Sequence, residues 1–380
     1  MDALLFSTKL FMLWYRAGIL TVAAGRNLYF LCNFDNRKEK KQMKRIDLEA
    51  HFVTPEYVNR MLANEGCPRY VDDKQAKIRR LYCFQDTPEP LPYVLFDKLL
   101  DLGEGRLRDM DAAGVDVQIL SLAPGVELFD PAIGTELAKK MNDALAAAIR
   151  KHPDRLMGFA SLAPKAPEAA ADELERAVKE LGFKGWKTNS NFGDSYLDDE
   201  EYWPILARAE KLDVPIYLHP ATPAIPQMRK YGFQLSGPVF GFGAETLLCL
   251  MRLILSGAFE RFPGLKIIIG HLGEGLPFIL ERIDFFHGKP FVFPEGKFKI
   301  RRKLSEYVKN NVLVTTSGNY LEPAFMCTYQ ALGIDRILLA TDYPYENSKD
   351  CMHFLEGLAL SQEEKNQIYS LNAKRLGISG

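Results

Sequence analysis

The stretch Leu48-Glu49-Ala50-His51 ends an apolar, β-like run with side chains that can bind a metal. Three later stretches end in the same way: Tyr217-Leu218-His219-Pro220, Gly270-His271-Leu272-Gly273-Glu274 and Thr341-Asp342-Tyr343-Pro344. A (β/α)8 barrel places the C-terminal ends of its strands around one mouth, so that ligands far apart in sequence meet at a single ion. The sequence therefore predicts a metal-dependent barrel enzyme.

The rest of the chain alternates between apolar, β-branched runs and helical patterns, as such a barrel requires. The predicted strands cover residues 44–51, 116–122, 155–162, 185–189, 215–219, 266–271, 311–317 and 336–342. The predicted helices cover residues 99–113, 132–151, 167–181, 199–212, 245–262, 276–287, 322–332 and 362–376. The alternative is an open doubly wound sheet, but no Gly-x-Gly-x-x-Gly turn follows the first strand. We therefore expect an α/β fold of the TIM-barrel type.

Composition limits the partners of the protein. A chain of 380 residues with 47% apolar residues can bury one large core, so a single barrel with insertions is the simplest organisation. The formal net charge is −1 with both signs interspersed, which argues against nucleic acid as a partner. Six cysteines are scattered without a C-x-x-C pair, so we expect free thiols and a cytoplasmic location.

Residues 1–42 do not fit the barrel pattern. The apolar runs 10–15 and 19–25 are broken by Lys9 and Arg16, so neither approaches the ~20 apolar residues of a membrane span. Residues 1–42 have three possible interpretations: a degraded leader, an amphipathic anchor, or sequence upstream of a true start at Met43. We favour the last. The basic run 37–45 is interrupted by Glu39 and predicts a solvated linker. The domain prediction is an N-terminal extension, 1–42, outside the fold, and a barrel domain, 43–380.

Two long insertions, residues 52–98 after the first strand and 220–244 after the fifth, fall on the mouth side. Loops there shape substrate pockets, and these two carry aromatic side chains that could enclose a flat substrate. For each aromatic residue taken singly, packing within its own loop is the better expectation. The residues are Phe52, Tyr70, Tyr82, Phe84, Tyr93, Phe240 and Phe242.

Three of the six histidines, His51, His219 and His271, stand at predicted strand ends. Glu49 and His51 are two apart on one strand, so both side chains point to the same face. Together with His219 and Asp342 they form a mixed nitrogen and oxygen set suited to Zn²⁺ or Mn²⁺, with positions left for water or substrate. Mg²⁺ is the remaining option.

His271 and Glu274 are close enough in sequence to touch. A carboxylate beside an imidazole raises its basicity and fixes its tautomer, which describes a general acid/base pair. The alternative is that Glu274 only favours the start of the helix that follows, through the helix dipole.

These motifs occur in order from residue 43 to the C-terminus, and the strand-four stretch 183–189 belongs to the same series. As a set they resemble the amidohydrolase-related decarboxylases, in particular the γ-resorcylate, 2,3-dihydroxybenzoate and 5-carboxyvanillate decarboxylases. The segments that carry the resemblance are Glu49-Ala50-His51-Phe52, His219-Pro220, Gly270-His271-Leu272-Gly273-Glu274-Gly275-Leu276-Pro277, Thr315-Thr316-Ser317-Gly318-Asn319 and Thr341-Asp342-Tyr343-Pro344-Tyr345-Glu346-Asn347.

The resemblance implies non-oxidative loss of CO₂ from an ortho-hydroxybenzoate without an organic cofactor. It places the reaction at one divalent metal held by Glu49, His219 and Asp342, with His51 in or beside the first shell. It assigns proton delivery to Asp342, with His271 and Glu274 assisting. It further implies substrate contacts by Phe52, Asn189 and Arg282, although a helix-surface ion pair is an equal reading of Arg282. A small aromatic acid is the expected partner, and a homodimer or homotetramer the expected assembly.

Three alternatives remain open at this point. The first is a metal-dependent hydrolase of a lactone or amide, in which Lys187 is the nearest candidate for a carbamylated lysine. The second is decarboxylation of a non-aromatic unsaturated acid, against which Glu49 argues because a histidine is expected there. The third is a catalytically silent binding protein. The stretches 121–125 and 188–191 reproduce no single subgroup, so the particular acid is left open.

Overall fold

The structure is a computed structural model that describes residues 23–24, 27–28, 43–292 and 300–379. The chain divides into two compact units, Met1–Gln42 and Met43–Gly380. In the first, β1 (Ala23–Ala24) pairs antiparallel with β2 (Asn27–Leu28). The apolar run 10–15 lies outside the described residues, and so does most of the runs 19–25 and 37–45. All further description concerns the second unit.

Eight parallel strands form a closed ring. One sheet has the order β3-β7-β8 and another the order β13-β12-β11-β10-β9. Parallel bridges from Ala160 to Trp186 and from Ala50 to Tyr343 join the two sheets at both edges. The prediction of a TIM barrel is confirmed. The strands are β3 (Ile46–Phe52), β7 (Val117–Leu122), β8 (Leu156–Gly158), β9 (Trp186–Asn189), β10 (Ile216–His219), β11 (Ile267–Ile269), β12 (Val312–Thr315) and β13 (Ile337–Leu338).

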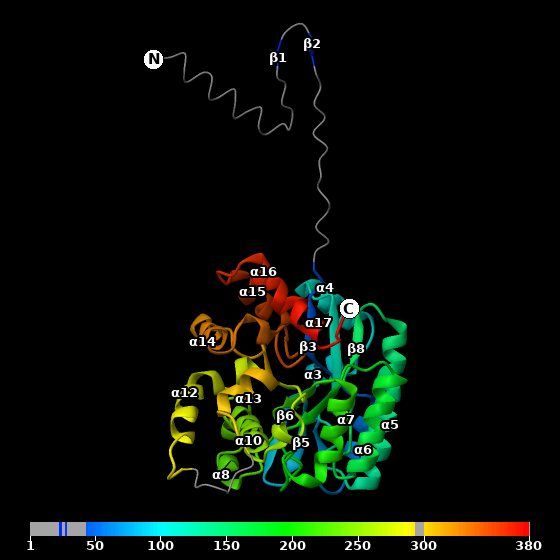
Figure 1. Ribbon diagram of the computed structural model, residues 1–380. Coiled ribbons are helices and arrows are strands. Elements are labelled where there is room, and N and C mark those ends of the chain that lie inside the picture. Colours follow the sequence, from blue (N-terminus) through cyan, green and yellow to red (C-terminus); the bar gives the residue numbers. More distant parts are fainter. Residues whose placement is uncertain (1–22, 25–26, 29–42, 293–299, 380) are drawn as a thin grey trace. The chain divides into compact units, whose positions relative to one another are not determined.

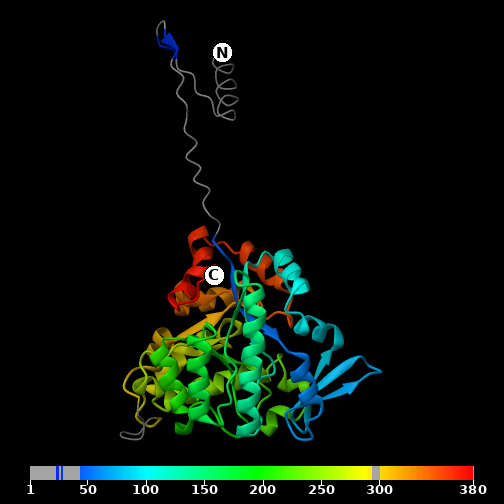
Figure 2. The same cartoon turned by 90° about the vertical axis from the view of Figure 1, so that its right-hand side faces the viewer.

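Helices lie outside the strands in both ribbon views (Figures 1 and 2). Two match their predicted bounds, α12 (Leu276–His287) and α14 (Glu322–Leu332). The predicted helix 245–262 is divided into α10 (Gly241–Leu255) and α11 (Ala258–Arg261), because Gly257 between them has a left-handed φ of 84°. The predicted helix 99–113 is likewise divided, into α3 (Tyr93–Leu100) and α4 (Glu104–Ala113).

The remaining helices complete the outer layer. The predicted helices 132–151, 167–181 and 199–212 correspond to α5 (Pro131–Lys151), α6 (Pro167–Lys179) and α7 (Trp203–Leu212). The last predicted helix, 362–376, consists of α16 (Gln362–Asn366), a π-helical stretch (Gln367–Leu371) and α17 (Asn372–Arg375). Outside the two insertions, α13 (Leu304–Asn311) and α15 (Ser348–Gly357) were not predicted. No helix among the described residues is long and apolar enough to cross a membrane.

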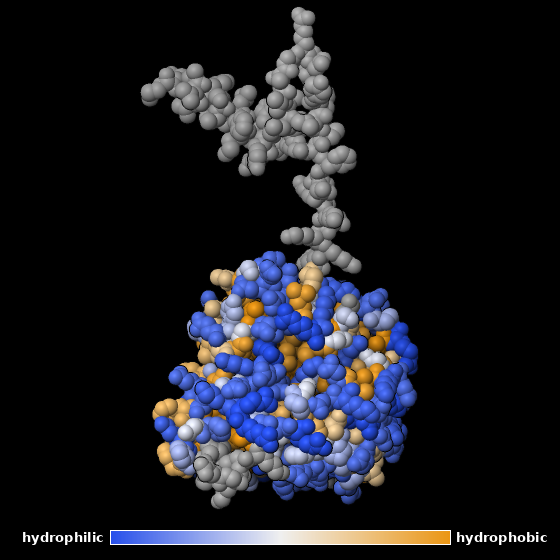
Figure 3. All heavy atoms as spheres, viewed as in Figure 1, coloured by the Kyte–Doolittle hydropathy of each residue, from blue (hydrophilic) through white to orange (hydrophobic). Residues whose placement is uncertain are grey.

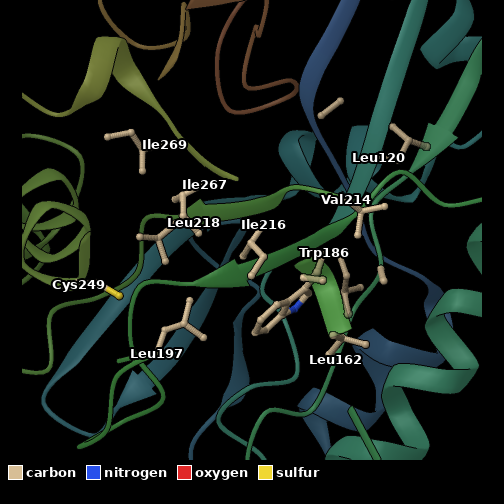
Figure 4. Packing of buried hydrophobic residues seen from close by; sticks show 14 of the residues in the cluster. Leu120, Leu162, Trp186, Leu197, Val214, Ile216, Leu218, Cys249, Ile267 and Ile269 are labelled. Carbon is tan, nitrogen blue, oxygen red and sulfur yellow. The ribbon is translucent and has the colours of Figure 1, made fainter. Parts of the chain in front are cut away.

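Alternation along the strands divides the buried side chains into two layers. On β11, Ile268 belongs to a small cluster with Tyr217, Leu313 and Leu338, whereas Ile267 and Ile269 belong to the large cluster between strands and helices. Figure 4 shows part of that large cluster, including Trp186, Ile216 and Leu218. Because successive side chains of a strand point to opposite faces, the small cluster fills the barrel interior. The functional side chains continue this inner face toward the mouth.

The segment after β3 has structure of its own. It holds α2 (Pro55–Leu62) and an antiparallel sheet of β4 (Arg69–Asp73), β5 (Ile78–Phe84) and β6 (Thr87–Pro92), which Figure 2 shows as light-blue strands at the side of the barrel. The segment after β10 holds the short helices α8 (Pro226–Arg229) and α9 (Phe233–Ser236). Both segments contribute to the cavity described below.

Candidate metal centre and cavity

The four predicted ligands come together at the mouth of the barrel. Glu49, His51, His219 and Asp342 each offer one ligand atom, and these atoms all lie within 4.8 Å of one another. His51 Nε2 lies 2.9 Å from Asp342 Oδ1, and His219 Nε2 lies 3.6 Å from Glu49 Oε1. Two imidazoles and two carboxylates in such a cluster form a site for a divalent ion of the zinc or manganese type.

Neighbouring groups orient the ligand atoms. The Nδ1 of His219 lies 2.8 Å from the carbonyl oxygen of Pro220, so Nδ1 carries the proton and Nε2 keeps its lone pair for a metal. The Ser317 hydroxyl donates to Glu49 Oε2 at 2.5 Å, while the buried Glu49 Oε1 has no hydrogen-bond partner among the described residues. A buried carboxylate oxygen without a donor is costly unless a cation faces it, so these residues fit a metal ion.

Electrostatics within the cluster point the same way. Burial raises the pKa of Asp342 to about 8, and burial followed by the charge of Asp342 raises the pKa of Glu49. Burial lowers the pKa of His51 to about 3 and that of His219 well below its ordinary value. The protein alone therefore disfavours the charged form of all four groups, and a divalent cation supplies the charge that two carboxylates require.

His271 and Glu274 form a pair, with His271 Nδ1 2.6 Å from Glu274 Oε1. Burial lowers the pKa of His271, but the charges of Glu274, Glu49 and Asp342 outweigh it and raise the pKa to about 10. The contact with the Glu274 carboxylate favours the protonated imidazole, in which Nε2–H is a donor directed by the bond at Nδ1. This contact favours the acid/base interpretation of Glu274 over a role restricted to the helix start.

The backbone around these groups is strained. His271, Leu272, Glu274 and Asp342 have positive φ values between 52° and 57°, which residues other than glycine rarely adopt. Gly318 packs so closely on His271 that a Cβ there would lie 2.2 Å from the ring carbon Cδ2. Strain of this kind persists only where the surroundings hold the chain in place, and it concentrates at functional sites.

A cavity of about 480 Å³ opens beside the metal ligands. Its wall includes His219, Asp342, His271 and Glu274, and a second group of polar side chains, Lys187, Asn189 and Glu89. Apolar side chains from both insertions and from the loop after β13 complete it: Leu81, Leu91, Leu95, Phe233, Phe242 and Tyr345. A cavity of this size and composition suits a small organic ligand with a few polar groups.

Two predicted substrate contacts lie elsewhere. Phe52 is 1% exposed and packs in the core, because it follows His51 on β3 and alternation turns its side chain toward the helices. Arg282 is exposed on α12, where its guanidinium lies 4.8 Å from the ring centre of Phe286, and it does not line the cavity. Asn189 does line it. Of the seven aromatic residues named in the insertions, Phe242 alone is among the cavity-lining residues.

Several lining residues were missed. Tyr345 lies with its ring centre 5.3 Å from that of His51, and it follows the Asp342 motif directly. Lys187 was considered only as a candidate for carbamylation, although it is two residues before Asn189 on β9 and strand alternation identifies it as another inward-facing side chain. Glu89 comes from β6, in the insertion 52–98 that was expected on the mouth side but in which no strand was predicted.

The fold and the ligand cluster define a metal-dependent enzyme of the (β/α)8 class. The chain belongs to the amidohydrolase family, whose sequence model (Amidohydro_2, amidohydrolase) matches residues 46–376. The chain is similar to γ-resorcylate decarboxylase of Polaromonas sp. strain JS666, with 38% identity over 87% of this chain and 98% of that protein.

Solved structures agree with this assignment. A dihydroxybenzoic acid decarboxylase from Polaromonas sp. JS666 with bound manganese and the inhibitor 2-nitroresorcinol is 36% identical, with a TM-score of 0.75 over 88% of this chain and 96% of that one. A 5-carboxyvanillate decarboxylase from Novosphingobium aromaticivorans with bound manganese is 35% identical, with a TM-score of 0.78 over 89% of this chain and 97% of that one. The resemblance read from the motifs is therefore confirmed.

Proposed function

We propose that this protein is a metal-dependent carboxy-lyase that removes CO₂ from an ortho-hydroxybenzoate without oxidation. The observation that carries the proposal is the cluster of Glu49, His51, His219 and Asp342 beside the His271–Glu274 pair, facing one cavity. Relatives that share this fold at 35–38% identity carry the names of aromatic acid decarboxylases.

The four ligands would hold one divalent ion, Mn²⁺ or Zn²⁺ with Mg²⁺ as a further option, which would supply Lewis acidity toward the carboxylate and the adjacent hydroxyl. With the ion bound, Asp342 would take up the proton that the substrate hydroxyl releases, and burial, which raises the pKa of Asp342, favours its holding that proton. That proton passes to the ring carbon that bears the carboxylate. The electron pair of the broken C–C bond then returns to the ring, which regains aromaticity as CO₂ leaves.

His271 has a separate task. Its protonated ring, held by Glu274 at Nδ1, presents Nε2–H as a donor to an oxygen of the substrate. A donor fixed before the reaction stabilises negative charge without reorganisation at the moment of proton transfer. Gly318 against the ring of His271 limits its movement.

The alternative of a metal-dependent hydrolase has less support. In residues 43–292 and 300–379 the described chain offers one cluster of at least three histidine, cysteine or carboxylate ligands, which suits one ion. The Lys187 ammonium donates to two carbonyl oxygens, as a charged amine does, whereas carbamylation would remove that charge.

We further propose that residues 43–380 carry the activity, that the protein assembles as a homodimer or homotetramer, and that it is located in the cytoplasm. The family match to 46–376 supports the first point, and free thiols at five described cysteines support the location. Assembly is supported by exposed aromatic side chains on and after α12: Phe278 is 84%, Phe285 58% and Phe291 77% exposed. Figure 3 shows hydrophobic areas at the edge where Figure 1 draws α12, on a face that is otherwise mostly hydrophilic. Exposed apolar area of this kind commonly marks an interface.

The test is a decarboxylation screen with purified, manganese-loaded protein on salicylate, the dihydroxybenzoates and 5-carboxyvanillate, following CO₂ and absorbance. We expect metal-dependent release of CO₂ that D342N abolishes. The matched control is D335N, because Asp335 is an exposed aspartate at the opposite end of β13. No release of CO₂ from any of these acids, together with hydrolysis of a lactone, would replace this proposal by the hydrolase.

A further inference from the structure

Lys187 is a buried cation that the proposed reaction does not use. It lies in β9 with 3% of its surface exposed, and it lines the cavity beside the metal ligands. Its Nζ donates to the carbonyl oxygen of Leu122 at 3.2 Å and to Asn189 Oδ1 at 3.3 Å. No ion pair joins Lys187 to a carboxylate within the described part of the chain. An ammonium has three N–H donors, so one remains for a group in the cavity.

The surroundings hold this ammonium in a fixed position. Glu127, which is also buried, accepts hydrogen bonds from the backbone N–H of Asn189 at 3.1 Å and from Asn189 Nδ2 at 3.2 Å. Because the amide nitrogen of Asn189 faces Glu127, its amide oxygen faces Lys187. Glu127 and Glu49 attract the ammonium and oppose the effect of burial, which lowers the pKa of Lys187. Glu127 thus orients the Asn189 amide, and the Asn189 amide oxygen in turn holds the Lys187 ammonium.

A purely structural role does not explain why a charged side chain is buried at position 187. The positions on either side of Lys187 are filled by Trp186 and Thr188, which are fully buried on the opposite face of the strand. An apolar side chain at position 187 would fill the inner face at a lower desolvation cost than a charge does. A buried charge without an ion pair is costly, and such groups concentrate at functional sites.

We infer that Lys187 binds an oxygen of the aromatic acid other than the carboxylate and hydroxyl oxygens taken at the metal centre. This rests on the proposed function. An ammonium donates only, so it selects an acceptor, and a ring hydroxylate accepts more strongly than a neutral hydroxyl because the bond is charge-assisted. Lys187 therefore favours acids with a further ring oxygen over acids that lack one.

Two nitrophenols separate this inference from the reaction itself. 2-Nitroresorcinol and 2-nitrophenol share the nitro group and one adjacent hydroxyl, and only the first has a second hydroxyl. Their dissociation constants with manganese-loaded protein can be measured by absorbance titration of wild type and K187M. We expect K187M to weaken 2-nitroresorcinol about 10- to 100-fold and 2-nitrophenol less than about 3-fold, the size of one hydrogen bond to a charged group.

K184M is the matched control, because Lys184 precedes β9 and does not line the cavity. Manganese content and melting temperature establish that each variant is folded and loaded, and K187Q replaces K187M if the latter does not fold. Equal weakening of both probes would show that Lys187 acts on the part they share, and unchanged binding of both would show that it makes no contact. Either result overturns the inference.

Failure of the proposed decarboxylase function can be distinguished from failure of the inference about Lys187. Binding of the nitrophenols needs the metal centre and the cavity but no loss of CO₂, so the probe ratio stays informative if no acid is turned over. If acids are turned over, we expect K187M to reduce kcat/KM for 2,6-dihydroxybenzoate more than for salicylate by the same factor as in the binding experiment.

Discussion

His51 Nε2 lies 2.9 Å from Asp342 Oδ1, although 291 residues separate them in the sequence. The contact joins the first strand of the barrel to the turn after the last one. Backbone hydrogen bonds join the same two segments. The N–H of His51 donates to the carbonyl of Tyr343 at 2.7 Å, and the N–H of Tyr343 donates to the carbonyl of Glu49 at 3.2 Å. The ligand cluster therefore stands on the line along which the ring of strands closes.

The pair of His271 and Glu274 predicts an effect on turnover. E274Q removes the charge that keeps His271 protonated, and we expect kcat to fall about 10²- to 10³-fold with manganese content unchanged, as for loss of a general acid/base. Steady-state kinetics and metal analysis check this. E281Q, an exposed change on the neighbouring helix α12, should retain wild-type kcat, and loss of manganese from E274Q would contradict the assigned role.

The hydroxyl of Ser317 predicts a change in metal affinity. It donates to Glu49 Oε2, so S317A leaves the ligand less firmly oriented, and we expect the dissociation constant for Mn²⁺ to rise about 10- to 100-fold. Calorimetric titration of metal-free protein measures it. S256A removes a hydroxyl bonded to the Leu253 carbonyl, outside the ligand cluster, and should bind Mn²⁺ like wild type. Equal affinities of S317A and wild type would refute the prediction.

The contact of Gly318 with His271 predicts that G318A is both less stable and less active. Gly318 has φ +72°, and an added Cβ would meet the imidazole at 2.2 Å, so either the loop or the ring must move. We expect a loss of about 1–3 kcal/mol in unfolding free energy and a lower kcat. Denaturant unfolding and kinetics check this against G357A, because nothing lies within 4 Å of a Cβ at Gly357.

Glu89 predicts a pH dependence of stability. Burial raises its pKa from 4.5 to about 7, against the hydrogen bond from Thr222 and the charge of Lys187. The folded protein keeps this proton to a higher pH than the unfolded chain does. This contribution to stability is therefore full at and below pH 4.5 and is lost as the pH rises through 7, by at most about 3 kcal/mol.

Melting temperatures of wild type and E89Q between pH 5 and 8 test this sign. The neutral amide has no proton to lose, so we expect E89Q to gain stability relative to wild type as the pH rises. E281Q, at an exposed glutamate, should follow the wild-type curve. If the difference in melting temperature between wild type and E89Q does not vary with pH, burial does not raise the pKa of Glu89.

Much of the site was predictable because strand-end motifs carry both fold and chemistry. Glu49 and His51 follow from alternation on one strand, and the metal cluster follows from the common mouth of parallel strands. Phe52 was assigned wrongly although the same alternation places it in the core. Proximity to a motif in sequence was taken as proximity to the substrate.

The missed features depend on contacts between distant segments. The sequence of the β4–β6 sheet predicts a loop, because its strands contain prolines and charged residues, as in Thr87-Pro88-Glu89-Pro90-Leu91-Pro92. Glu89 reaches the cavity only through packing of that sheet near the segment after β10, where Thr222 donates to it. Helix α15 was missed between the Asp342 motif and the last helical pattern, although Asn347 caps it by accepting from the N–H of Lys349.

The bridge between Ala50 and Tyr343 has a consequence for biosynthesis. Glu49 and His51 leave the ribosome early, whereas Asp342 follows only after seven further strands. A growing chain can therefore offer an ion at most three of its four ligands until the last strand has docked beside the first. Coordination by all four side chains therefore requires a ring of strands that is already closed.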